Sequence, residues 1–254
     1  MFEDKVSQDD LTAFDEDGYR VLKRIHPIER IELLQEAASL LTPRIALPEV
    51  LPRGVELSQI ESDERLPSRI EPIIAHSLIV REFALGEYTT HLASRFIGED
   101  VFLLEDKLIY KPPRSHDVYP PHQEWWWTKN YSLRNLMLVI PLTRCTPENG
   151  PLYVVAGSHR GGLLPHVADI IPDECFDHNR CIPLLLELGD AAVVDGGTVH
   201  FSLENNSSTE RTLLLLSYNA AREGDCYARH RESWTYLPGE ELIRGPGSQL
   251  DSHE

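Results

Sequence analysis

The second part of the chain, from Gly98 onward, is a succession of short β-rich runs separated by turn-forming residues. The runs are VFLLEDKLIYK, LMLVIPL, PLYVV, PLLLEL, AAVVD, TVHFSL and RTLLLLSYN. Asn149-Gly150, Gly189-Asp190 and Gly196-Gly197 stand between them and favour tight turns. Several short strands at this spacing are typical of a sandwich, a barrel or a jelly roll. The pattern therefore predicts a layered β core.

The first part of the chain shows mainly helical patterns. We expect a short helix between Ser7 and Gly18, followed by a half-buried strand over residues 19–25. Pro27 opens a longer helix, in which apolar residues recur every three or four positions, and Pro43 is expected to end it.

Residues 42–70 are rich in proline and predict a long surface connection. Two further helices are expected over residues 72–82 and 87–96. We expect one domain in three parts: a mostly helical part packed outside the β core (1–98), the β core itself (99–220) and a C-terminal extension (221–254), frayed from about residue 240.

The charge balance excludes several classes of function. The chain has 41 acidic and 24 basic residues, a net charge of -17, which disfavours nucleic acids, anionic membranes and phosphate-rich coenzyme A thioesters. No apolar run is long enough to span a bilayer, and the acidic N-terminus resembles no signal peptide. The four cysteines form no CxxC pair, which favours a reduced, cytoplasmic setting.

Three residues suggest a metal site. His122 and Glu124 are separated by one residue, so on an extended segment their side chains point to the same side. His200 lies in the later run TVHFSL. Two histidines and one carboxylate on one face of a metal form the facial triad of non-haem Fe(II) oxygenases.

Such an iron centre needs a co-substrate that supplies electrons. If this is a 2-oxoacid with a distal carboxylate, a fixed cation should anchor it. Arg211 begins the run after His200, and a hairpin of that length would return it beside His200. Its planar guanidinium matches a carboxylate. Ser202 faces the same side as His200 and could add a hydroxyl donor.

Several short motifs follow one another along the chain. In order these are Phe14–Leu22, Lys111–Arg114 followed by His122–Glu124, Asn149–Leu152, Ala156–Arg160, Gly189-Asp190, His200, Asn205 and Arg211. Through this ordered succession, rather than through any one motif, the sequence resembles the phytanoyl-CoA dioxygenase family of Fe(II)/2-oxoglutarate-dependent oxygenases over most of its length.

The resemblance implies a double-stranded β-helix, or cupin-like jelly roll, with N-terminal helices outside. It implies iron held by His122, Glu124 and His200, and Arg211 bound to the C5 carboxylate of 2-oxoglutarate. Lys111 and Gln123 stand where the family often places further contacts to co-substrate or substrate. Dioxygen and 2-oxoglutarate would be consumed and succinate and carbon dioxide released, with ascorbate in a supporting role.

One residue departs from the family pattern, which usually has aspartate where this chain has Glu124. Glutamate is still an anionic oxygen ligand, so the departure affects coordination geometry more than metal binding. Halogenases of this superfamily have a small residue there, which makes room for chloride. Glu124 therefore favours hydroxylation or another oxidative reaction over halogenation.

Trp125, Trp126 and Trp127 are the most unusual local feature. On an extended segment they cannot all face one core, so one or two would pack beneath the helices and at least one would line a substrate pocket. We also place Tyr119 and Arg134 at this pocket. An aromatic wall suits a planar, apolar or cationic substrate.

The sequence thus predicts a dioxygenase that hydroxylates a small molecule in specialised or amino-acid metabolism. A desaturase, cyclase or epimerase of the same class is one alternative. A catalytically silent, metal-binding cupin-like protein is another, and an oxygenase acting on a protein is a third.

Overall fold

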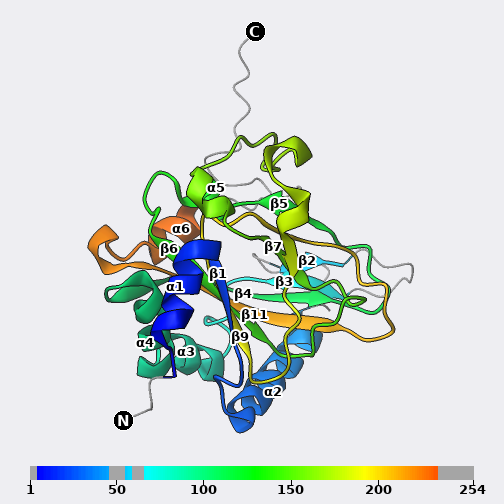
Figure 1. Ribbon diagram of the computed structural model, residues 1–254. Helices are drawn as coiled ribbons and strands as arrows, with labels where there is room; N and C mark the ends of the chain where they lie inside the picture. The colour runs from blue at the N-terminus through cyan, green and yellow to red at the C-terminus, as the bar shows by residue number, and fades with distance from the viewer. Residues whose placement is uncertain (1–4, 46–54, 59–65, 234–254) are drawn as a thin grey trace.

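The structure is a computed structural model that describes residues 5–45, 55–58 and 66–233. Two antiparallel β-sheets form its centre (Figure 1), and every strand pair in them is antiparallel. The larger sheet has seven strands, in the order β1 (Tyr19–Leu22), β9 (Ala191–Asp195), β6 (Asn135–Pro141), β11 (Arg211–Ala220), β4 (Val101–Lys111), β3 (Pro67–Ile70) and β2 (Val55–Leu57). The smaller sheet has four, in the order β5 (Tyr119–His122), β10 (His200–Ser202), β7 (Leu152–Val155) and β8 (Cys181–Pro183).

The described chain also contains α-helices and short 3-10 turns. The α-helices are α1 (Gln8–Asp17), α2 (Ile28–Ile45), α3 (Leu78–Leu85), α4 (Glu87–Ile97), α5 (Trp125–Thr128) and α6 (Tyr227–Ser233). Four short 3-10 turns are η1 (Ser158–Gly161), η2 (Asp173–Cys175), η3 (His178–Arg180) and η4 (Ala221–Glu223). Figure 1 shows α1, α3 and α4 gathered on one side of the strands.

The central strands β6, β9 and β11 of the larger sheet are buried on both faces, and the sequence shows why. In β11 the run of four leucines alternates between two cores: Leu214 and Leu216 pack with the helices, whereas Leu213 and Leu215 face the smaller sheet. A continuous apolar run is typical of a strand covered on both sides. The predicted arrangement, a mainly β core with N-terminal helices outside, is confirmed.

The N-terminal helix α1 is tied to the segment that precedes β10. Ser7 and Asp10 form a capping box at the start of α1, and Gly18 ends it in the left-handed conformation, with φ 75°. A side chain at Gly18 would meet the Thr198 hydroxyl at 2.3 Å, so this close approach requires glycine. The Thr198 hydroxyl donates to the Gly18 carbonyl oxygen at 2.8 Å, which fixes the chain two residues before His200.

Three local predictions are wrong. Residues 42–70 are not one surface connection, because β2 and the fully buried β3 lie within this range and extend the larger sheet beyond β4. Helix α2 runs to Ile45, two residues past Pro43. The run PLLLEL (183–188) forms no strand, since β8 ends at Pro183. The predicted fraying from about residue 240 lies outside the described residues.

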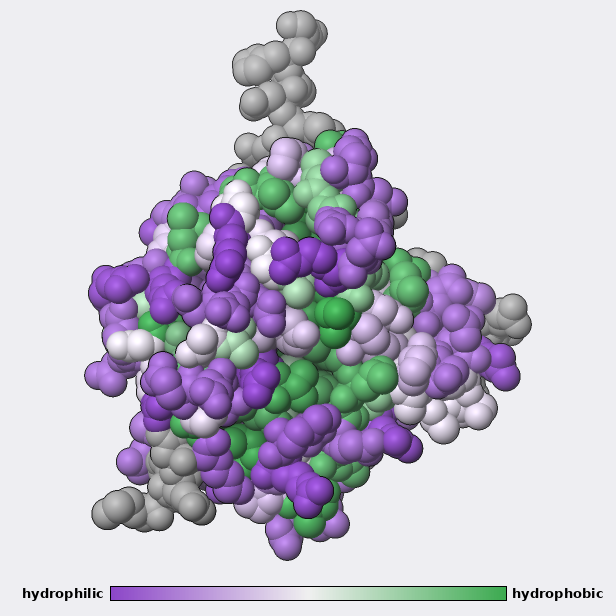
Figure 2. All heavy atoms as spheres, viewed as in Figure 1, coloured by the Kyte–Doolittle hydropathy of each residue, from purple (hydrophilic) through white to green (hydrophobic). Residues whose placement is uncertain are grey.

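The surface in the view of Figure 1 is mostly polar. Figure 2 shows hydrophilic residues over most of this face, with apolar residues gathered across its middle. Among the described helices, none combines the length and apolar character that a membrane span requires. All four cysteines are free thiols.

Candidate metal centre

Two histidines from neighbouring strands of the smaller sheet face each other. His122 ends β5 and His200 begins β10, and the two residues are directly paired in the antiparallel register. Paired residues place their side chains on the same face of a sheet. The ring centroids are 4.2 Å apart, so the register alone brings together two residues that lie far apart in the sequence.

Each imidazole directs its Nε2 atom into the space beside Glu124. The reason is that its Nδ1 atom is engaged by a backbone carbonyl, that of Pro120 for His122 (2.7 Å) and that of Thr198 for His200 (2.9 Å). A carbonyl oxygen can only accept, so Nδ1 carries a proton, and in the neutral ring Nε2 then has the lone pair that a metal needs. Burial lowers the pKa of His122 to about 3, so this ring stays neutral.

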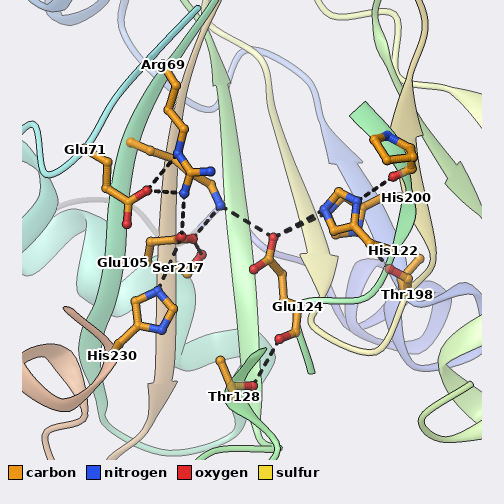
Figure 3. A network of polar contacts seen from close by, with 12 residues as sticks. Arg69, Glu71, Glu105, His122, Glu124, Thr128, Thr198, His200, Ser217 and His230 are labelled. Atoms are coloured by element: carbon orange, nitrogen blue, oxygen red, sulfur yellow. Dashed lines mark hydrogen bonds and ion pairs between the residues drawn. The ribbon is translucent and has the colours of Figure 1, made fainter. Parts of the chain in front are cut away.

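Glu124 supplies the third ligand atom of this cluster (Figure 3). Its Oε1 lies 3.4 Å from His200 Nε2 and 3.9 Å from His122 Nε2. The expected extended segment is wrong, however: β5 ends at His122, and Glu124 has helical backbone angles (φ -59°, ψ -29°) as the residue before α5. The two side chains converge through a turn rather than through strand alternation.

The Glu124 carboxylate is buried and ionised. Burial alone would raise the pKa of Glu124, but the Lys107 ammonium offsets burial, and the pKa lies well below its usual range. The three ligand atoms lie within 4.8 Å of one another. Two neutral imidazoles and one carboxylate are the donors that a divalent iron ion takes in a facial triad. The residues present therefore fit such a metal.

A second cluster, of Glu71, Glu105 and His230, also brings three possible ligands together. In this cluster, however, positively charged side chains of the protein already pair with the two carboxylates. Arg69 forms an ion pair with Glu71 and lies 3.7 Å from Glu105, and Lys107 lies 2.6 Å from Glu105. This cluster is a buried ion-pair network, and it adjoins Glu124 (Figure 3).

A cavity of about 360 Å³ opens beside the three ligand atoms. It lies between the two sheets, since β4, β6 and β11 supply one wall and β5, β7 and β10 supply another. Its walls include His122, Glu124, His200, Arg211, Ser202, Tyr119, Trp127, Lys107 and Arg69.

Arg211 brings a buried cation to the same cavity. It begins β11 and is 1% exposed, and its Nε donates to the Gly150 carbonyl oxygen at 3.1 Å. Among the described residues, its Nη1 has no hydrogen-bond partner. Leaving a buried donor of a charged group unsatisfied is costly. The site is therefore suited to an anionic ligand that would accept this hydrogen bond.

The predicted pocket residues divide into two groups. Tyr119 and Trp127 line the cavity, and Trp127 packs edge-on against His122 with centroids 5.1 Å apart. Within the described chain, Trp125, Trp126 and Arg134 lie elsewhere. Trp125 packs against the backbone of Gly197, Trp126 stacks on His166, and Arg134 donates to the Ile97 carbonyl oxygen. The three tryptophans diverge because they form a helical turn, not the extended segment that we expected.

Lys111 and Gln123 are also not among the described residues that line the cavity. The Lys111 Nζ atom donates to the Leu203 carbonyl oxygen and lies near the Tyr119 ring, and burial followed by Arg211 lowers the pKa of Lys111 to about 6. The Gln123 amide donates to the carbonyls of Gly162 and Gly197, and its oxygen accepts from the Leu164 amide. Gln123 thus ties two loops together beneath the site.

Our interpretation of the sequence missed Lys107, Glu105 and Arg69. The available signal was the charged residues inside the apolar strand VFLLEDKLIYK. Strand alternation places Glu105, Lys107 and Ile109 on the cavity side. Which carboxylates these cations meet depends on tertiary packing.

Comparisons with known proteins agree with this geometry. The sequence profile described as "Phytanoyl-CoA dioxygenase (PhyH)" matches residues 14–213. An ectoine dioxygenase from Sphingopyxis alaskensis is 31% identical over 159 residues, which cover 61% of this chain and 50% of that protein. A methylphosphonate hydroxylase from Gimesia maris is 29% identical over 189 residues, covering 67% of each chain. The matched region thus spans half of the first relative and two thirds of the second.

Solved structures show the same fold. The crystal structure of EctD from S. alaskensis with 2-oxoglutarate and 5-hydroxyectoine has a TM-score of 0.74 at 24% identity, over 88% of this chain and 80% of that one. The structure of EctD with bound Fe has a TM-score of 0.71 at 26% identity, with the same coverage.

Proposed function

The chain belongs to the phytanoyl-CoA dioxygenase family, and we propose that it is an Fe(II)/2-oxoglutarate-dependent dioxygenase that hydroxylates a small molecule. The observation that carries the proposal is the convergence of His122, Glu124 and His200 in a cavity that also contains the unsatisfied Arg211 donor. The cavity volume lies at the small-molecule end of the usual range for ligand sites.

In this proposal, His122, Glu124 and His200 hold the iron. When bound, Fe(II) supplies dioxygen activation, with 2-oxoglutarate as the source of electrons and succinate and carbon dioxide as its products. The backbone carbonyls of Pro120 and Thr198 keep both imidazoles in the tautomer that ligates. Because the ligands sit on two strands and a helix end, their positions are fixed before any ligand arrives.

Arg211 anchors the co-substrate. Its Nε is already committed to Gly150, and its Nη1 would donate to the distal carboxylate of 2-oxoglutarate. Ser202 lines the same cavity and could donate its hydroxyl. Lys111 is paired with Arg211 in the register of β4 and β11, so its contribution would be to support Arg211 from the neighbouring strand rather than to contact the co-substrate.

Trp127 and Tyr119 orient the primary substrate and keep water from its reacting carbon. Both present aromatic surface to the cavity. The relatives named above act on ectoine and on methylphosphonate. Compounds of this size suit the cavity and, together with the strongly acidic surface, argue against a coenzyme A thioester.

The test is turnover of 2-oxoglutarate by tag-free protein supplied with Fe(II), ascorbate and air. Succinate is quantified by mass spectrometry across a panel of small zwitterionic and anionic compounds. We expect succinate above the background of a His200→Ala variant, together with a product that gains one oxygen atom from isotopically labelled dioxygen. Product that loses hydrogen without gaining oxygen would indicate a desaturase. Absence of succinate with every compound, despite metal binding, would favour the silent metal-binding alternative.

A further inference from the structure

Lys107 joins the candidate metal centre to the buried ion-pair network. Its ammonium Nζ lies 2.6 Å from Glu105 Oε2 and 3.6 Å from Glu124 Oε1. The side chain is 10% exposed and comes from the middle of β4, so the strand fixes the origin of the side chain. One buried cation therefore lies beside two buried carboxylates, one of them a proposed metal ligand.

The Glu105 end of this contact is held firmly. Glu105 is buried, and Ser217 of β11, His230 of α6 and Arg69 of β3 all approach its carboxylate, at 3.3, 3.4 and 3.7 Å. Figure 3 shows Arg69, Glu71, Glu105 and His230 on one side of Glu124 and the two imidazoles on the other. Lys107 is thus anchored on the side away from the imidazoles.

The contact between Lys107 and Glu124 bears directly on the metal centre. Lys107 approaches Oε1, the same oxygen that lies nearest to His200 Nε2 and His122 Nε2. In the metal-free protein this ammonium supplies the nearest full positive charge that the structure gives Glu124. A metal ion on that oxygen would bring a second cation within a few ångströms of the first, in surroundings that screen charge poorly.

We propose, on the basis of the metal centre proposed above, that Lys107 is a positioning residue for Glu124. In the metal-free protein its ammonium supplies the positive charge beside the Glu124 carboxylate, and once a metal ion binds, the ammonium repels it. The first effect keeps the carboxylate turned toward the imidazoles. The second weakens the metal affinity. A glutamate ligand has one more rotatable bond than aspartate and loses more conformational freedom when it is fixed, so a group that holds it is useful here.

A purely structural role for Lys107 makes a different prediction. If Lys107 served only to hold Glu105 within the network, its loss would lower the stability of the metal-free and metal-loaded proteins equally. If it serves as the counter-charge of Glu124, its loss harms mainly the metal-free protein, where Glu124 would be left buried without its ammonium. The metal would then restore stability, and by linkage it would bind more tightly.

The experiment compares the rise in melting temperature that Mn²⁺ produces in tag-free wild type, Lys107→Met and Lys107→Arg, with Mn²⁺ dissociation constants from calorimetry. Lys107→Gln, which keeps a hydrogen-bond donor toward Glu105 without the charge, replaces Lys107→Met if that variant fails to fold. Lys23→Met is the matched control, because Lys23 also pairs with a buried carboxylate, that of Asp190, but its own side chain is 61% exposed and it does not line the cavity.

We expect a lower melting temperature for metal-free Lys107→Met, a larger Mn²⁺-induced rise than in wild type, and affinity tighter by about tenfold. Lys107→Arg, which keeps the charge, should restore the wild-type rise, and Lys23→Met should not alter it. An unchanged or smaller rise in Lys107→Met, or in Lys107→Gln where it replaces that variant, would overturn this inference while leaving the metal centre intact. Absence of any Mn²⁺ effect in wild type would instead count against the proposed function.

Discussion

Arg211 and Gly150 are joined by a hydrogen bond from the guanidinium Nε to the backbone carbonyl oxygen, 3.1 Å long. This bond fixes the plane of the guanidinium, so that its remaining donors point in set directions. One of them, Nη1, is buried in the described structure without an acceptor. Arg211 thus brings a buried positive charge with an unused hydrogen-bond donor to the cavity that contains the three metal-ligand atoms.

Replacing Arg211 should weaken co-substrate binding selectively. Arg211→Lys keeps the charge but loses the planar fork, and hydrogen bonds to charged groups contribute about 1.5–3 kcal/mol. We expect the KM for 2-oxoglutarate to rise by about tenfold to a hundredfold, with a smaller change in the KM for the primary substrate. Steady-state kinetics would check this, with the surface variant Arg222→Lys as the control. Equal changes in both constants would contradict the assigned role.

Two adjacent tryptophans should respond differently to the same substitution. Trp127 lines the cavity, so Trp127→Leu should raise the KM for the primary substrate and lower kcat. Trp126 stacks on His166 and donates to Asp169 at 2.6 Å, so Trp126→Leu should lower the melting temperature and leave the KM close to that of wild type. A larger effect on KM from Trp126→Leu would show that the substrate approaches from the other side of α5.

His26 should make the fold sensitive to acid. Its ring is buried between Phe83 and Tyr88, neither nitrogen has a hydrogen-bond partner among the described residues, and burial, followed by Arg30, lowers the pKa of His26 to about 4. The unfolded chain takes up the proton near its ordinary pKa of about 6.5. The free energy of unfolding therefore falls as the pH drops from about 6.5 to about 4, by about 3 kcal/mol from this residue.

The variant His26→Phe removes this titration and both unsatisfied nitrogens. We expect it to be more stable than wild type at neutral pH, with an advantage that grows as the pH falls toward about 4 and then levels off. Urea unfolding across this pH range would measure the difference. Parallel curves for the two proteins would show that His26 is not neutral in the folded state.

Much of the β core could be predicted from sequence because its strands are apolar runs between turn residues. The expected runs match β4 and β9 to the residue and β11 to within one residue. The strands β2 and β3 could not be predicted in this way. They are three and four residues long, lie among prolines, and exist because β4 offers an edge to pair with. Such pairing is not local and leaves no period in the sequence.

The candidate site could likewise be predicted only in part. The spacing of His122 and His200, taken with the family resemblance, was enough to place both in one centre. The geometry of Glu124 was predicted from an extended segment that does not exist, because nothing local signals the turn after His122. The contacts of Lys107 and its carboxylate partners could not be predicted, because they join residues of β3, β4, β11 and α6 that meet only in the folded protein.

The most direct test of the metal centre is equilibrium binding of Mn²⁺ to the tag-free protein, followed by the loss of the electron paramagnetic resonance signal of the free ion. Our account predicts one bound ion per chain in wild type and in the control variant His178→Ala, because His178 is exposed and does not line the cavity. It predicts loss of that ion in both His122→Ala and His200→Ala. Unchanged binding in these two variants, or the absence of binding in wild type, would contradict it.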